Sequence, residues 1–252
     1  MVRGLYTAAA GMNVQRNKMN NLTNNVVNAE TTGYKKDILV TTPFNEIMLK
    51  RMKNPDVEGY GKVELGELGY GSYVSKAYTD FSQGNIENTG WMTDLAIVGD
   101  GFFTIETAKG ERYSKDGTFS VSADGYLATQ DGNYVLGQDG RIFVGTGEFK
   151  VSADGTVTNN LGETTQLRIA EFEDLTVLRK EGANLYYILG DDQPIEPLNS
   201  KILQGARESS NVDVTEEMAE MIAVYRRYEA SQRIVSMTDD SLGLAVNIGR
   251  VN

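Results

Sequence analysis

The 252-residue chain contains no cysteine and no histidine, and it has only four prolines and one tryptophan. Without thiols it forms neither disulfide bonds nor thiolate nucleophiles. Without imidazole it lacks the base of a Ser-His-Asp triad and the commonest ligand of transition metals. Most familiar catalytic designs are therefore excluded, and we expect neither a cofactor nor a bound metal.

Positive charge is also scarce, because 24 Lys and Arg residues stand against 35 Asp and Glu residues, for a formal net charge of -11. Nucleic acids and anionic membranes attract cationic surfaces, so neither is expected as a partner. No run approaches the ~18 apolar residues of a membrane span. Polar Thr7, Asn13 and Gln15 interrupt the N-terminal sequence before the apolar core of a secretory signal. We expect no membrane span and no export by a cleaved signal peptide.

Apolar residues recur in seven-residue steps at both ends of the chain. Near the N-terminus the row consists of Leu5, Met12, Met19 and Val26, accompanied by Ala8, Gln15 and Leu22. Near the C-terminus it consists of Val214, Met221, Tyr228, Val235 and Leu242, accompanied by Met218, Tyr225 and Val246. Such narrow stripes are typical of coiled coils. The second helix is predicted to begin after Asp213, which with Glu216 fits a capping box.

The first helix has an unusual composition. Seven Asn residues lie between Asn13 and Asn28, and at ~0.5 kcal/mol each relative to Ala they cost an isolated helix roughly 3 to 4 kcal/mol. We therefore expect this helix to fray until something surrounds it. One possibility is that the two helices pair with each other within one chain and make no other contact. The free-energy cost of forming the first helix instead favours packing against further copies. Gly33 is the predicted stop, with Lys35 and Lys36 at the negative end of the helix.

The middle of the chain follows a different pattern. Six Asp-Gly pairs separate short alternating runs such as "FFTIET" and "NYVLG", which indicates antiparallel hairpins because Gly accepts the positive φ of tight turns. The segment "FSVSADGYL" from Phe119 is echoed by "FKVSADGTV" from Phe149, which predicts two similar hairpins. Five aromatic residues of this region are expected in the core: they are Tyr60, Tyr70, Tyr73, Tyr78 and Trp91.

The predicted fold class is α+β, with the N- and C-terminal helices forming a coiled-coil-like helical domain and a mainly antiparallel β domain inserted between them. The predicted boundaries are an N-terminal helix at 1–33, a connecting segment at 34–70, a β-rich domain at 71–205 and a C-terminal helix at 206–252.

Candidate catalytic groups are few. A hydrolase of cell-wall glycan would need two carboxyl groups at a fixed separation in a cleft, for which Asp94, Asp100 and Asp116 are the candidates. A carbohydrate-binding β module is a further alternative. It would leave both terminal heptad rows without a role.

Four blocks in order resemble the bacterial flagellar basal-body rod and hook proteins. They are "GLYTAAAGM" with "NNLTNNVVNAETTGYKK", "TGWMTDLAIVGDGFF", "YSKDGTFSVSADGYL" and "SNVDVTEEMAEMIAVYRRYEASQRIVSMTDDSL". The length suits a rod protein better than the longer hook protein, although a hook-type axial subunit is the alternative. The segment "LGYGSYVSKAYTDFSQGNIENTG" resembles the distal-rod type, with the proximal-rod type second.

This resemblance implies a structural axial subunit without enzymatic activity. Such a subunit is exported by the flagellar type III apparatus and polymerises helically into the hollow driveshaft between motor and hook, in the periplasm. The implied partners are further copies of the chain, other rod proteins, the hook protein and the P- and L-ring bushing proteins. The terminal helices would form an inner domain lining a channel, and the β-rich middle an outer domain.

The resemblance also implies a subunit interface. Its predicted residues are Leu5, Met12, Met19, Leu22, Asn25, Val26, Val214, Met218, Met221, Tyr225, Tyr228, Val235 and Leu242. The ending "GLAVNIGRVN" extends past that of better-known members, and the segment from Phe44 to Val63 is where the subtype would be decided.

Overall fold

The computed structural model describes residues 2–44, 47–51, 63–69, 71–182, 184–190, 194–195 and 200–249. It begins and ends with a long helix, and antiparallel strands lie between them. The α+β class and the order of its elements are therefore confirmed. Neither long helix contains, within its described residues, an apolar stretch long enough to cross a membrane.

The chain folds into two compact units. The helical unit comprises Met1–Val26, Asp37–Tyr78 and Val214–Asn252, and the β unit comprises Val27–Lys36 and Thr79–Asp213. The chain therefore passes from one unit to the other four times, after Val26, Lys36, Tyr78 and Asp213.

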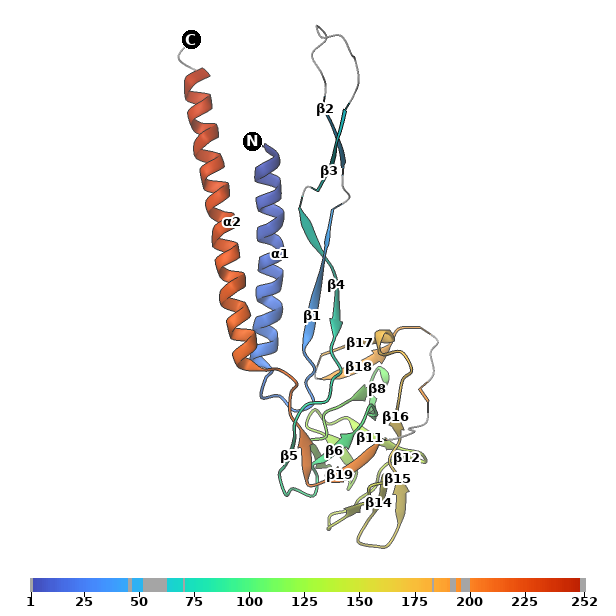
Figure 1. The fold of residues 1–252 in the computed structure, drawn as a ribbon. Coiled ribbons are helices and arrows are strands. Elements are labelled where there is room, and N and C mark those ends of the chain that lie inside the picture. Colours follow the sequence, from blue (N-terminus) through green and yellow to red (C-terminus); the bar gives the residue numbers. More distant parts are fainter. Residues whose placement is uncertain are drawn as a thin grey trace. The chain divides into compact units, whose positions relative to one another are not determined.

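Among its described residues, the helical unit contains two helices and two strand pairs. Its elements are α1 (Val2–Val27), β1 (Asp37–Pro43), β2 (Ile47–Arg51), β3 (Val63–Leu68), β4 (Ser72–Thr79) and α2 (Val214–Gly249). Helices α1 and α2 lie side by side and run in opposite directions (Figure 1). Strand β1 pairs with β4, and β2 pairs with β3.

The boundaries of the helices confirm one sequence prediction and correct another. Helix α2 begins at Val214, directly after Asp213 as predicted, and carries two acidic residues in its first turn, where they complement the helix dipole. Helix α1 ends at Val27 and has no basic residue in its last turn. The prediction that Gly33 ends this helix and that Lys35 and Lys36 flank it is therefore wrong. Gly33 does have a positive φ of 64°, but in a later turn.

The β unit is built from short strands. They are β5 (Ile86–Asn88), β6 (Leu95–Val98), β7 (Phe102–Thr107), β8 (Gly110–Ser114), β9 (Phe119–Val121), β10 (Leu127–Thr129), β11 (Tyr134–Gly137), β12 (Gly140–Arg141), β13 (Lys150–Val151), β14 (Thr156–Thr158), β15 (Thr164–Gln166), β16 (Ile169–Ala170), β17 (Leu178–Lys180), β18 (Leu185–Ile188), β19 (Lys201–Gln204) and β20 (Ala206–Glu208), with a short 3-10 helix, η1 (Leu175–Val177).

The largest sheet of the β unit has the strand order β17-β18-β8-β7-β11-β10-β9, and β12 and β16 pair with β11 and β7. Three smaller sheets accompany it: β13-β14-β15, β6-β19 and β5-β20. The larger of the two apolar clusters includes Leu95, Phe103, Phe119, Val135 and Ile142. The smaller contains Phe102, Tyr113, Phe172 and Tyr186.

The internal sequence echo corresponds to two hairpins of the same design, as predicted. In the first, β9-β10, Ser122 N donates to Tyr126 O and Gly125 N donates to Ser122 O, at 2.8 and 2.9 Å. In the second, β13-β14, the equivalent bonds join Ser152 to Thr156 and Gly155 to Ser152, both at 2.9 Å. Both glycines have positive φ, which an L side chain rarely adopts.

The six Asp-Gly pairs are not all alike. Four of their glycines have positive φ, at positions 125, 132, 140 and 155, whereas Gly101 and Gly117 do not. At Gly117 the requirement is space instead, because an added Cβ would lie 1.5 Å from the carbonyl oxygen of Leu95. The turn chemistry was therefore assigned correctly at four of the six positions.

The expectation that the aromatic residues lie in the core is wrong for three of them. Tyr73, Tyr78 and Trp91 are 43%, 50% and 71% exposed. Tyr60 and Tyr70 lie outside the described residues. The β-propensity of an aromatic residue favours a strand, but it does not show whether that residue is on the face of the strand that the core covers.

Candidate subunit interface

The line along which α1 meets α2 includes small and polar residues. An added Cβ on Gly11 would lie 3.6 Å from Ser231 Oγ, and Asn25 bonds Glu217, so these are facing pairs. The fourteen-residue step from Gly11 to Asn25 on α1 matches the fourteen-residue step from Ser231 back to Glu217 on α2. At the midpoints of these steps, Lys18 and buried Val224 line one pocket.

The residues of the predicted apolar rows lie beside this line. Leu5, Met12, Met19, Leu22 and Val26 of α1 are partly buried, as are Met221, Tyr228, Val235 and Leu242 of α2. Val214, Met218 and Tyr225 are 41%, 52% and 51% exposed. The two terminal helices are confirmed, whereas coiled-coil packing of their apolar rows stays a prediction, as does their role between subunits.

Helix α2 also carries apolar residues on sides that the structure leaves exposed. One row follows the helical spacing through Met218, Ile222 and Tyr225, which are 51 to 56% exposed. A second row runs through Ile234, Met237, Leu244 and Ile248, which are 51 to 74% exposed. A helix that only covers one neighbour normally has one apolar stripe. The additional rows have the character of surfaces that another molecule covers.

Asn25 joins three elements of the helical unit. It is 1% exposed. Its Oδ1 accepts from the backbone N of Asp37 at 3.1 Å, and its Nδ2 donates to the backbone O of the same residue at 3.1 Å. The same Nδ2 donates to Glu217 Oε2 at 3.2 Å. The side chain thus pairs with the start of β1 as a neighbouring strand would, and it also holds the first turn of α2.

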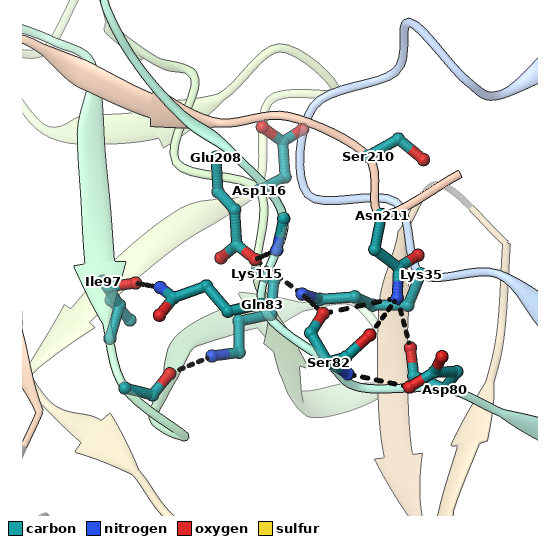
Figure 2. Close-up of polar contacts among 12 residues, drawn as sticks. Lys35, Asp80, Ser82, Gln83, Ile97, Lys115, Asp116, Glu208, Ser210 and Asn211 are labelled. Carbon is teal, nitrogen blue, oxygen red and sulfur yellow. Dashed lines mark hydrogen bonds and ion pairs between the residues drawn. The ribbon is translucent and has the colours of Figure 1, made fainter. Parts of the chain in front are cut away.

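A buried ion pair links the two segments of the β unit that adjoin the helices in sequence. Lys35 Nζ lies 2.5 Å from Glu208 Oε1, and these side chains are 0% and 1% exposed. Lys35 Nζ also donates to the carbonyl of Ser82, and Gly84 N donates to Glu208 Oε1, both at 2.8 Å. Figure 2 shows Lys35 and Glu208 directed toward each other beside Ser82. The pair fixes segments that are 173 residues apart in the chain.

Asn211 makes a second connection between the same segments. Its Oδ1 accepts from Lys36 N at 2.8 Å, and its Nδ2 donates to the carbonyl of Asp80 at 2.9 Å (Figure 2). Asp80 N in turn donates to the carbonyl of Lys36 at 2.9 Å. We call Lys35, Ser82, Glu208 and Asn211 the polar cluster.

Lys115 lies beside the polar cluster and is 3% exposed. Its Nζ donates to the carbonyl of Gly99 at 2.6 Å and lies 5.0 Å from the ring centroid of Phe102. Burial lowers the pKa of Lys115 to about 8, although Glu208 opposes the shift. Burial likewise raises the pKa of the neighbouring carboxyl of Asp116, while its hydrogen bonds from Thr118 and Thr32 oppose the change.

Two of the three candidate carboxylates of a glycan hydrolase accept hydrogen bonds from nearby threonine side chains. Asp94 Oδ2 accepts from Thr89 Oγ1 at 2.7 Å, and Asp116 Oδ1 accepts from Thr32 Oγ1 at 2.8 Å. Asp100 is exposed at a bend. Within the described part of the chain, no group of three or more acidic side chains is arranged to hold a metal ion. The perturbed pKa of Asp116 therefore arises where the carboxyl supports a turn.

Three family models match the chain in order. The model described as flagella basal body rod protein covers residues 5–35, that of the flagellar hook protein FlgE/F/G D1 domain covers 96–159, and that of the flagellar basal body rod FlgEFG protein C-terminal covers 203–248. The first and last matches contain both partners of the Asn25–Glu217 contact and of the Lys35–Glu208 pair.

Curated relatives match over essentially the whole chain. The flagellar hook-basal body complex protein FlhO of Bacillus subtilis is 34% identical over 100% of both chains. The flagellar basal-body rod protein FlgG of Borreliella burgdorferi is 30% identical over 99% of this chain and 100% of its own. The flagellar basal-body rod protein FlgF of Caulobacter vibrioides is 30% identical over 100% of both.

Two terminal helices that flank an antiparallel β unit in the sequence, with apolar rows exposed along α2, are features of a structural subunit. The chain belongs to the flagellar basal-body rod protein family. It is a structural subunit of the flagellar rod, and the hydrolase alternative is not favoured.

Sequence reasoning missed the polar cluster. Lys35 was assigned to the end of α1, and neither Glu208 nor Asn211 was singled out. Nothing in a single sequence pairs residues so far apart. The one available signal was the placement of Lys35 beside Gly33 and Tyr34 in a short segment without helical periodicity, which is more typical of a packed turn than of a solvated helix end.

Proposed function

We propose that this rod subunit polymerises helically through its helical unit into a hollow driveshaft between the motor and the hook. The observation that carries the proposal is the pair of exposed apolar rows on α2, which one chain leaves uncovered. Contacts with neighbouring copies on more than one side of α2 would remove both rows from water. At about 25 cal/mol per Å² of apolar surface, that burial favours association.

The finer assignments follow from the same proposal. The terminal segments at 1–33 and 206–252, which contain α1 and α2, form the inner domain, the segment at 34–70 connects, and the β-rich part at 71–205 forms the outer domain. The partners are further copies, other rod proteins, the hook protein and the P- and L-ring proteins. The subunit has no enzymatic activity and reaches the periplasmic rod through the type III apparatus without a cleaved signal. The distal-rod position rests on the segment from Leu68 to Gly90.

The thirteen predicted interface residues fall into three groups under this proposal. Val214, Met218 and Tyr225 contact other copies directly, because they are exposed in the single chain. The partly buried positions on both helices contribute at the margins of the α1–α2 pair, where neighbouring helices complete their burial. Asn25 acts within the chain.

The test separates contacts between copies from contacts within the chain. Ile222→Asp places a charge in an exposed row, so it should abolish filaments while leaving the helices and the β unit folded, because an unpaired buried charge costs several kcal/mol. Leu161→Asp, at an exposed apolar position of the β unit, is the matched control and should still polymerise, because the proposed contacts between copies lie in the helical unit. Met221→Asp and Val235→Asp, at partly buried positions, should disrupt both polymerisation and the helix pair.

Electron microscopy and sedimentation of the purified full-length chain give the readout, and circular dichroism reports folding. Filaments formed by Ile222→Asp as readily as by the parent would refute the proposed surface. Release of soluble sugar from cell-wall glycan by the parent, and its loss in Asp116→Asn, would instead support a hydrolase.

A further inference from the structure

The facing sides of α1 and α2 repeat in a way that does not fix how far one helix lies along the other. A slide of seven residues would place Gly11 beside Thr238 in place of Ser231, so one small polar neighbour replaces another. The apolar rows beside this line also repeat at sevens. A surface pocket of about 170 Å³ is lined by Leu22, Asn25 and Val224 together with residues of β1.

Asn25 breaks this repetition. In the observed register its amide meets Glu217 and both main-chain groups of Asp37. Sliding α2 by seven residues in one direction would bring Val224 opposite Asn25. The amide would keep its two bonds to Asp37 but lose its bond to Glu217, because Val224 offers no hydrogen-bonding group. The opposite slide brings Lys18 to Glu217 and so keeps one charge contact. It carries Asn25 beyond the first turn of α2.

We infer that Asn25 is the positioning residue that sets the register of α1 against α2, acting through Glu217 and the main chain of Asp37. A single buried Asn can specify the alignment of paired helices whose apolar rows alone leave it open. The inference concerns the helix pair itself and does not depend on whether the chain polymerises.

Because the chain contains no cysteine, any intrachain disulfide must join two introduced cysteines. Disulfide formation can therefore report the register of the two helices without background from native thiols. A disulfide forms only between Cβ atoms about 3.5 to 4.5 Å apart. The pair Gly11→Cys and Ser231→Cys reports the observed register. Gly11→Cys with Thr238→Cys, and Gly11→Cys with Val224→Cys, report slides of seven residues in either direction. After mild oxidation of the full-length protein, gel mobility separates intrachain from interchain products and quantifies each.

With Asn25 present, the 11–231 disulfide should exceed each of the other two by at least about tenfold, as expected when a slide leaves a buried polar group unpaired. Asn25→Val should reduce this preference to less than about threefold. Asn20→Val, an exposed Asn on the same helix, should leave it unchanged. Asn25→Asp should also reduce the preference, because a carboxylate oxygen would then face both Glu217 and the carbonyl oxygen of Asp37.

Each other outcome contradicts the inference. An unchanged preference in Asn25→Val would show that the chain connections, not Asn25, set the register. Equal yields of the three disulfides with Asn25 present would show that no register is set. If Asn25→Val lost all three products and its helical circular dichroism together, Asn25 would be a stabilising residue and not a positioning one.

Discussion

The buried Lys115 makes the stability of the β unit depend on pH in an uncommon direction. Its pKa falls from 10.5 to about 8 on folding, because burial disfavours the ammonium form more than Glu208 favours it. At about 1.36 kcal/mol per pKa unit, the charged Lys115 weakens the folded state by about 3 kcal/mol relative to a neutral side chain. That penalty is large against the marginal stability of a folded domain.

The sign follows from where the proton is bound. Below pH 8 both states hold it, and the full penalty is present. Between pH 8 and 10.5 the unfolded chain binds more protons than the folded one, so the free energy of unfolding rises with pH. Lys115→Met keeps the unbranched shape and removes the charge. The free energy of unfolding of the variant should therefore lack the increase with pH that Lys115 causes in the parent. Relative to the parent, the stability of the variant should fall by about 2 kcal/mol between pH 7 and pH 9.5.

The assay is denaturant unfolding followed by the fluorescence of Trp91, which is the only tryptophan in the chain and lies in the β unit. Comparing variant and parent at each pH cancels the titration of all other groups. At pH 7 the variant should be more stable, although the lost bond to the Gly99 carbonyl offsets about 1 kcal/mol. A difference between the two proteins that stays constant from pH 7 to 9.5 would refute this account of Lys115.

Three further expectations concern the polar cluster and α1. Lys35→Met alone and Glu208→Leu alone should each destabilise the β unit by about 3 to 5 kcal/mol, whereas the double variant should be more stable than either; additive losses would contradict the pairing. Gly33→Ala should cost at least about 2 kcal/mol more than Gly132→Ala in thermal unfolding. Both glycines have positive φ, but only at Gly33 would a Cβ meet backbone, at 2.4 Å from Asp116 N. Circular dichroism should show much less helix in dilute monomer than in filaments, and full helicity in the monomer would disprove the expected fraying of α1.

Local chemistry allowed much of the fold to be predicted. The start of α2 after Asp213 and the two echoed hairpins follow from capping and turn rules that involve only neighbouring residues. The stop assigned to Gly33 failed for an instructive reason. A positive φ marks a turn but not which element the turn follows, and α1 had already ended at Val27.

The side of each helix that faces its partner was harder to predict. A heptad row identifies an apolar stripe, but α2 has apolar residues on several sides, and the residue that lies nearest Gly11 of α1 is Ser231, which belongs to neither predicted apolar row. Small residues permit close approach of the backbones, so they occupy the line of contact and displace Met218 and Tyr225 to exposed positions. The ion pair of Lys35 with Glu208 was out of reach because it depends on the tertiary path of the chain.

The buried polar contacts and the exposed apolar rows have opposite physical properties, and this suits them to different tasks. Asn25 and the pair Lys35–Glu208 are nearly inaccessible to water, so wrong geometry leaves them unpaired at a high free-energy cost. Contacts of this kind favour one arrangement within each unit. The rows of α2 are apolar and non-directional, so they tolerate small differences between neighbours. A subunit whose internal geometry is fixed by polar contacts can therefore offer an adaptable apolar surface to several different partners in one rod.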